Sequence, residues 1–467
     1  MSDRRRVVVV GGGISGLATA HRLLRDDADV TVTLLESSPV LGGKIATADV
    51  AGLTVDTGPD SLLVRLPAVR ALLDELGLAA EVAGPACTGA FVWTRGALRP
   101  LPPASLFGVP EKLVPLLTSG LVTPLGLARA GADLVLPRTP MPADPTIADL
   151  LRPRLGDEVF DRLIDPMLGG VHAGRADRLS ARSAVPEVMA ILDGSRSVYL
   201  TMRRREKKPA TGPALVSMPG GMGRLRDALA SSIHQAEVRT SSRVVALDRL
   251  PDGGYLVRTD DEAFPADDVV VTTPAYAAAA LLGPLAPQAS HALRGIDYAD
   301  VATVMLAYDR SDVGHALDGT GFLVPAVDRR LLVGCSWLTS KWGHLAADDR
   351  VVIRAMVGRD GDDRFTTYDD DALVAAIRTE LAESTGVVGS PTQVHVQRWP
   401  AAMPQYTVGH AERLSRIDAA LAELPGLHLT GAAYRGVGLA GCISQAVRTA
   451  AAVRTRARTH DITTAAR

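Results

Sequence analysis

The hydrophobic and polar positions near the start of the chain predict a strand, a turn and a helix, in that order. Residues 7–10 are four consecutive valines, and such a continuous β-branched run is typical of a parallel strand covered on both faces. A helix is expected over residues 14–25, and the apolar run over residues 30–35 predicts a second strand. The pattern therefore indicates the beginning of an α/β fold with a parallel sheet.

Three glycines between the first strand and the helix predict a phosphate-binding turn. Gly11, Gly13 and Gly16 have the spacing that permits a tight turn, a close approach of backbone to a pyrophosphate and close packing of helix on strand. The free N–H groups at the start of the helix would face that phosphate. Glu36 follows the second strand at the distance where a carboxylate accepts hydrogen bonds from ribose hydroxyls. Together these features predict a dinucleotide site.

The next glycines favour FAD over NAD. Gly42, Gly43 and Lys44 follow Glu36 closely, and a short extended segment over residues 53–56 leads into the turn Gly58-Pro59-Asp60-Ser61. In an NAD dehydrogenase the third strand usually continues the wound sheet. A glycine pair followed by a cation instead suits a second length of phosphate and ribityl chain.

A second strand, glycine loop and helix stand near the other end of the chain. Residues 427–430 predict a strand that runs into Gly431, and the glycine-rich residues 434–441 precede a helix over residues 442–453. Two such units that close one nucleotide fold indicate FAD.

Composition and charge exclude several classes of protein. Hydrophobic residues make up 47% and charged residues 22% of the chain, which excludes disorder as a description of the whole. The formal charge of -2 creates no global field for nucleic acid, so no nucleic-acid partner is expected. Cys87, Cys335 and Cys442 have no metal-ligand spacing, so we expect structural thiols in a reducing compartment and no metal site.

No membrane-spanning helix is expected. The four valines after Arg4, Arg5 and Arg6 are too few for the apolar region of a signal peptide, which favours the cytoplasm. Residues 113–128 carry little charge but are interrupted by prolines and glycines and are too short to span a bilayer. They predict buried helices of a substrate domain or, alternatively, one apolar face against a membrane surface.

These segments together resemble the protoporphyrinogen and coproporphyrinogen III oxidase family, in the wider group of amine oxidases and phytoene desaturases. The wider group is indicated by VVGGGISGLATAHRL, LGGK, SMPGGMGRL and TGAAYRGVGLAGCI. The family itself is indicated by residues 156–158, 165–174, 179–180, 336–342 and 398–410, in that order along the chain. His172 stands where the family usually has tyrosine, so no role is carried over to that position.

The resemblance implies a Rossmann-like FAD-binding domain interleaved in sequence with an α+β substrate-binding domain and a helical subdomain. The FAD-binding domain would comprise residues 1–85, 211–285 and 390–455, with strands over residues 238–247 and 268–272. Residues 86–210 would form the helical subdomain on the substrate or membrane side. Residues 286–389 would form the substrate-binding sheet, with strands over residues 301–308 and 351–357, and residues 456–467 a C-terminal tail.

The resemblance also implies a reaction. Coproporphyrinogen III would lose six electrons in three two-electron steps and become coproporphyrin III in haem biosynthesis, with oxygen as acceptor and hydrogen peroxide as product. Protoporphyrinogen IX as substrate, an amine oxidase, a phytoene-type desaturase and a non-catalytic FAD-binding protein are the alternatives, which peroxide release with each substrate distinguishes. Peripheral contact with a membrane and transient contact with the next enzyme of haem synthesis stay open.

No catalytic residue is assigned, because the chain shows no Ser/His/Asp set, metal-ligand cluster or obvious acid/base pair, and a tautomerising macrocycle needs less proton transfer by the protein than a hydrolysis would. Val244 is placed near the adenine, and Trp399 at the cofactor, by resemblance. Arg65 and Lys341 are the candidate contacts to substrate propionates, with ordinary surface charges as the alternative. The residues expected to bind noncovalent FAD are Gly11, Gly12, Gly13, Ile14, Ser15, Gly16, Glu36, Ser37, Gly42, Gly43, Lys44, Gly58, Pro59, Asp60, Ser61, Val244, Trp399, Gly431, Val437, Gly438 and Leu439.

Overall fold

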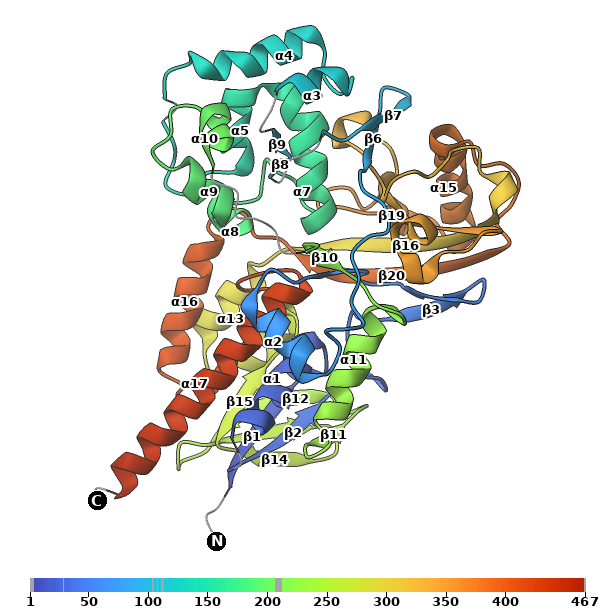
Figure 1. Ribbon diagram of the computed structural model, residues 1–467. Coiled ribbons are helices and arrows are strands. Elements are labelled where there is room, and N and C mark those ends of the chain that lie inside the picture. Colours follow the sequence, from blue (N-terminus) through green and yellow to red (C-terminus); the bar gives the residue numbers. More distant parts are fainter. Residues whose placement is uncertain are drawn as a thin grey trace.

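The computed structural model describes residues 4–27, 29–102, 105–106, 108–110, 113–138, 140–205 and 212–465. It combines a five-stranded sheet, a seven-stranded sheet and a group of helices (Figure 1). In the figure the five-stranded sheet is at the bottom, the seven-stranded sheet crosses the middle and right, and the helices between α3 and α10 lie at the top. The α/β class expected from the sequence is confirmed.

The five-stranded sheet is parallel throughout, with the N-terminal strand at its centre. The strand order is β11 (Glu237–Arg239), β2 (Val30–Leu35), β1 (Arg5–Val10), β15 (Asp268–Val271) and β21 (Leu427–Leu429). Val7 and Val9 pack into one core cluster and Val8 and Val10 into another, on opposite faces. A strand covered on both faces needs apolar side chains at every position, which explains the run of valines.

Helices from distant parts of the chain cover the two faces. One face packs against α1 (Ile14–Asp26), α2 (Pro67–Glu75), α11 (Gly221–Ser232) and α17 (Leu439–Ala465). The other packs against α12 (Ala275–Leu282), α13 (Pro287–Arg294), α16 (His410–Ala422) and the three-stranded sheet of β12 (Val244–Arg249), β13 (Tyr255–Thr259) and β14 (Ala263–Ala266). The last helix is longer than expected and includes most of the predicted C-terminal tail.

The single strand expected over residues 238–247 is wrong, because the structure has two strands there. β11 pairs with β2 in the five-stranded sheet, whereas β12 pairs with β13 in the three-stranded sheet. The polar segment Thr240-Ser241-Ser242 separates them, and Ser241 takes a positive φ of 51° that ends the extended backbone. Each strand therefore enters a different sheet.

The seven-stranded sheet lies above the carboxyl edge of the parallel sheet. Its order is β20 (Gln393–Pro404), β16 (Tyr298–Asp309), β19 (Arg350–Val357), β18 (Leu332–Trp337), β17 (Gly321–Leu323), β6 (Phe91–Thr94) and β7 (Ala97–Pro100). One face packs on α15 (Asp370–Thr385). The other face meets β3 (Thr47–Val50), β4 (Leu53–Asp56) and the segment that begins with α14 (Leu338–Lys341).

This sheet crosses the domain boundaries proposed from the sequence at two places. β20 belongs to it, although residues 390–455 were assigned to the FAD-binding domain, and β6 and β7 extend it from the segment 86–210. The reason is pairing: β20 is hydrogen-bonded to β16 along most of its length. For the rest of the chain, we propose the same division into domains that the sequence predicted.

Apart from short 3-10 turns, the remaining elements are mostly helices. They are α3 (Leu113–Thr118), α4 (Pro124–Gly131), α5 (Ile147–Leu155), α6 (Asp157–Val159), the π-helix Phe160–Ile164, α7 (Asp165–His172), α8 (Ala181–Ala184), α9 (Pro186–Leu192) and α10 (Val198–Arg204), with short pairs β8 (Ser105–Leu106) and β9 (Val109–Pro110), and β5 (Leu62–Leu63) and β10 (Leu215–Val216). Leu116 and Leu121 are buried here, whereas Val114 and Leu125 are exposed, so residues 113–128 form helices that are only half buried. Among the described residues, no helix is long and apolar enough to cross a membrane.

Asp268 connects the two ends of the chain to the middle of the parallel sheet. Its buried carboxylate pairs with Arg5 on β1 and with Arg456 on α17, the latter at 2.9 Å, and His428 on β21 lies 3.5 Å away. Burial alone would raise the pKa of Asp268, but His428, Arg5 and Arg456 hold the pKa below its ordinary value. The ionised carboxylate is therefore part of the folded state.

We expect Asp268→Asn to lower the free energy of unfolding by about 2 to 3 kcal/mol at pH 7, because it leaves two guanidinium groups without their anion. A lowered folded-state pKa stabilises the protein above the unfolded pKa of about 4, and that contribution is lost as the pH falls below it. Urea unfolding at pH 7 and pH 3 should show the difference shrinking in acid. Asp267→Asn is the matched control, because Asp267 pairs with Arg6 at the surface; an equal loss there would contradict the assignment.

Candidate active site

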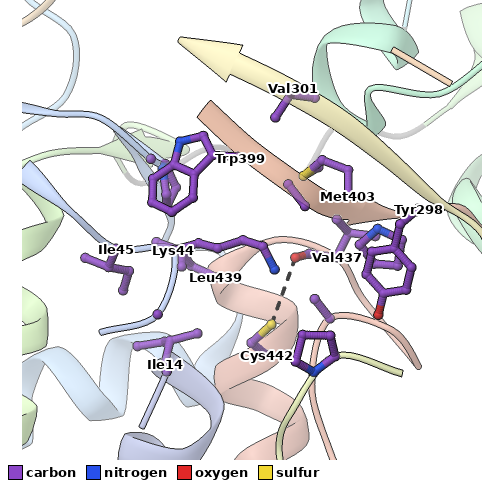
Figure 2. Close-up of a pocket in the computed structure, with 18 of the residues that line it drawn as sticks. Ile14, Lys44, Ile45, Tyr298, Val301, Trp399, Met403, Val437, Leu439 and Cys442 are labelled. Carbon is purple, nitrogen blue, oxygen red and sulfur yellow. Dashed lines mark hydrogen bonds between the residues drawn. The ribbon is translucent and has the colours of Figure 1, made fainter. Parts of the chain in front are cut away.

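A cavity of about 1130 Å³ opens where the carboxyl edge of the parallel sheet meets the seven-stranded sheet. Figure 2 shows Ile14 on one side of it, Val301 from β16 with Trp399 and Met403 from β20 on the other, and the side chain of Lys44 reaching between them. The ends of parallel strands are the usual position of a nucleotide site in an open α/β sheet.

The first glycine turn forms the floor of the cavity. Gly11 has a positive φ of 108°, and a Cβ on Gly16 would overlap the carbonyl oxygen of Gly11, so both positions require glycine. Gly13 is the residue before α1 and makes no side-chain cap, and a Cβ added there would meet only Gly43, at 4.0 Å. The start of α1 therefore presents free N–H groups and open space to the cavity, which suits a phosphate.

Glu36 is held rigidly at the end of β2. One carboxylate oxygen accepts from Gly12 N at 2.6 Å, and the other accepts from Ser38 N at 2.7 Å. The side chain is 9% exposed and lines the cavity. A carboxylate fixed by two backbone donors still has lone pairs available to ribose hydroxyls.

The second glycine turn closes against the first. Gly42 N donates to Gly12 O at 2.9 Å, and Gly42 and Gly43 both have positive φ, at 121° and 58°. Lys44 follows and lines the cavity, where burial lowers the pKa of its ammonium group. A partly desolvated cation beside the two glycine turns is suited to a phosphate or an electron-rich ring.

The C-terminal loop also contributes to the cavity lining. Gly436 has a φ of 136° and lies against Gly441, while Val437, Gly438 and Leu439, the first residue of α17, line the cavity. A Cβ on Gly438 would meet no protein atom within 4 Å, so the space beside it belongs to the cavity. The residues present therefore fit a bound dinucleotide, with a second helix beginning at its edge.

The turn over residues 58–61 carries a charged network. Asp60 accepts from Lys341 Nζ at 2.7 Å and lies 3.9 Å from Arg354 Nη1, and Trp342 Nε1 is 3.4 Å away. Burial alone would raise the pKa of Asp60, but Lys341 and Arg354 keep it well below its ordinary value. Asp60 is thus ionised at neutral pH.

Most residues proposed from the sequence come together at this cavity. Those that line it are Gly11, Gly13, Ile14, Ser15, Glu36, Ser37, Gly42, Gly43, Lys44, Gly58, Pro59, Asp60, Ser61, Val244, Trp399, Val437, Gly438 and Leu439. Gly12, Gly16 and Gly431 lie just behind its lining, and the first two shape the turn by the contacts described above.

The two candidate substrate contacts do not lie in the cavity lining. Arg65 is exposed on the segment before α2, and the ammonium group of Lys341 is engaged by Asp60. Neither side chain lines the described cavity, and a direct contact of either with a substrate stays a prediction.

Several lining residues were missed. Thr272, Thr273 and Pro274 follow β15 directly, and the rule that sites gather at the carboxyl ends of parallel strands could have found them. Arg354 is a cation in the middle of the otherwise apolar run 351–357, and a charge in such a run is itself a signal. Tyr298, at the start of β16, carried no sequence signal that we recognise.

His172 and His410 lie in the protein core, and the three cysteines form no disulfide. Both histidines are buried outside the cavity lining, and burial lowers the pKa of each, for His172 to about 4. Both are therefore neutral at pH 7. The three cysteines are free thiols, and Cys442 lines the cavity below Lys44 (Figure 2).

The whole chain is similar to known flavoproteins. The family described as "Flavin containing amine oxidoreductase" matches residues 14–454. Coproporphyrinogen III oxidase of Bacillus subtilis (strain 168) is 32% identical over 458 residues, covering 95% of this chain and 97% of the relative. The enzyme of the same name from Mycobacterium tuberculosis (strain ATCC 25618 / H37Rv) is 36% identical over 458 residues, covering 96% and 97%.

Comparison with solved structures gives the same result. The crystal structure of a candidate protoporphyrinogen oxidase from Exiguobacterium sp. 255-15 has a TM-score of 0.86 and 33% identity, covering 96% of this chain and 98% of that one. Putrescine oxidase, at 19% identity and a TM-score of 0.65, shares the fold. The chain belongs to the flavin-containing amine oxidoreductase family, in the branch of the porphyrinogen oxidases that the sequence predicted.

Proposed function

We propose that this chain oxidises coproporphyrinogen III to coproporphyrin III with noncovalently bound FAD and oxygen. The observation that carries the proposal is similarity over nearly the whole length to coproporphyrinogen III oxidases. The geometry supports it, because one cavity joins the glycine turns of a dinucleotide site to an apolar wall of the second sheet.

The residues of the two glycine turns, Glu36, Lys44 and the 437–439 loop would hold the cofactor, as the cavity lining and the open space at Gly13 and Gly438 suggest. FAD, when bound, supplies the acceptor for a hydride. Six hydrogens leave the macrocycle in total, and three molecules of oxygen take them up as three molecules of hydrogen peroxide.

The far side of the cavity suits the apolar ring system of a tetrapyrrole. Gly169 and Gly170 on α7 present bare backbone, and Leu323, Val333 and Met356 come from the seven-stranded sheet. Such a wall excludes water and holds a reacting carbon in position, which is the main task of the protein in hydride transfer. Tyr298 lines the same space, and burial raises its pKa to about 12, so it stays protonated and neutral.

We expect coproporphyrinogen III to bleach the flavin fastest when the oxidised enzyme is mixed anaerobically with each substrate in a stopped-flow instrument. Protoporphyrinogen IX should react more slowly, because it offers two propionates instead of four to the cations of the site, and a simple amine should not react. Readmission of oxygen should restore the flavin and release peroxide. Equal or greater kcat/KM on protoporphyrinogen IX would transfer the assignment to that substrate.

We expect acid precipitation to release all of the flavin as FAD. Cys442 is the cysteine of the cavity lining, and burial raises the pKa of its thiol, which disfavours the thiolate that covalent attachment requires. Chromatography of the supernatant measures the release, and Cys442→Ser should bind the same amount of flavin. Yellow colour that stays with the wild-type pellet but not with the Cys442→Ser pellet would contradict noncovalent binding.

Gly438→Val and Gly13→Val should reduce the flavin content to less than about a tenth of the wild-type value, because each side chain fills space that backbone and cofactor share. The ratio of flavin to protein absorbance measures this, and circular dichroism of the apoprotein should stay unchanged. Gly131→Val is the matched control: its Cβ also meets no protein atom, but it lies on α4, outside the cavity lining. Full flavin content in both site variants would rule out this cofactor position.

A further inference from the structure

The central part of β19 places a buried cation in the wall of the cavity. Arg354 lines the cavity and is 8% exposed, while its neighbours Ile353 and Ala355 point into the core on the opposite face of the sheet. Burying a guanidinium group is costly unless its N–H groups find acceptors. The surroundings of Arg354 therefore indicate what it binds.

The protein itself satisfies Arg354 poorly. Its Nη1 is 3.9 Å from Asp60 Oδ1, which is too long for a hydrogen bond, and its buried Nε has no partner. Asp60 instead accepts directly from Lys341 Nζ at 2.7 Å. Lys341 thus provides the counter-charge that Asp60 needs, and the donors of Arg354 stay available to another anion.

Two polar groups of the same lining are engaged with the backbone rather than with Arg354. Thr303 Oγ1 and Trp399 Nε1 both donate to the carbonyl oxygen of Thr57, at 2.7 Å and 3.1 Å. The other cations of the cavity lining in the described part of the chain are Lys44 and Arg243, which lie on loops beside the parallel sheet. Arg354 is accordingly the cation that the seven-stranded sheet contributes to the described lining.

We propose that Arg354 binds a carboxylate of the substrate, and that Lys341 supports this contact by keeping Asp60 from neutralising the guanidinium group. The proposal rests on the function proposed above and replaces the direct role that the sequence suggested for Lys341. A guanidinium group suits a carboxylate, because its planar fork donates two parallel hydrogen bonds.

A second anion could use the same donors, namely the pyrimidine edge of a reduced flavin. Two features favour the substrate. Arg354 shares its wall with Ser336 and Met356 of the same sheet, whereas the side chain of Lys44 is the cation that reaches toward Val437 and the C-terminal loop (Figure 2). The two sources differ in their measurable consequences.

The test is an equilibrium titration of the FAD-loaded protein with coproporphyrin III, followed by porphyrin fluorescence, so that no turnover is needed. We expect Arg354→Met to weaken binding by about 10- to 100-fold, which is the loss expected for hydrogen bonds to a charged group. Arg354→Lys should recover part of the affinity, because it keeps the charge but loses the fork.

Arg350→Met is the matched control. Arg350 lies on the same strand but at its far end, where it donates to Ala51 O and pairs with Asp349. Its loss should leave coproporphyrin affinity within about twofold of wild type. Melting temperature and flavin content, measured for each variant, separate a binding defect from a folding defect; Arg354→Met leaves Asp60 paired with Lys341 and should fold.

Lys341→Met gives an independent readout. Without the lysine, Asp60 would draw Arg354 toward itself, so porphyrin binding should weaken although Lys341 is outside the cavity lining. The midpoint potential of the bound flavin, measured by dye-coupled reduction, should stay unchanged in both variants. Wild-type affinity in Lys341→Met would overturn the supporting role.

Three further results of these measurements would each lead to a different conclusion. A more negative flavin potential in Arg354→Met, with unchanged porphyrin affinity, would overturn the carboxylate contact and assign the anion to reduced flavin. No change in either quantity would overturn the proposal altogether. A wild-type protein that fails to bind coproporphyrin III would instead contradict the proposed function.

Discussion

Parallel pairing of β15 with β1 on one side and β21 on the other is the constraint on which the site depends. These strands come from the beginning, the middle and the end of the chain, and their parallel register places all three carboxyl ends at one edge. Asp268 reinforces the arrangement, because its buried charge is balanced by one arginine from each end of the chain. The glycine turns at that edge therefore form a single cavity.

The close approach of Gly16 to Gly11 determines how α1 is placed at that carboxyl edge. Because no side chain separates them, α1 packs directly against the turn, and its first N–H groups face the cavity. Gly42 then hydrogen-bonds to the first turn, so that the two glycine segments form one surface. The seven-stranded sheet covers this surface and supplies a wall with few charges.

The charged groups at and beside that wall form one network. Lys341 contacts Asp60 directly, while Arg354 approaches the same carboxylate only at 3.9 Å. Burying an incompletely paired cation lowers the stability of the protein. Such cations are common at sites where a ligand completes the pairing. The apolar surroundings strengthen any such contact, since water does not screen it. Specificity for an anionic substrate can thus depend on one charged side chain in the largely apolar wall that the seven-stranded sheet supplies.

The sequence by itself determined the elements around the nucleotide. Residues 30–35 form the predicted strand, the predicted helix over residues 14–25 lies within α1, and most of the predicted glycines line the cavity, because turn geometry and strand periodicity are local properties. Local patterns did not show that residues 237–249 divide between two sheets, that β20 pairs with β16, or that Arg354 rather than Arg65 lines the cavity. Those features depend on which distant strands become neighbours, and only the packed tertiary structure decides that.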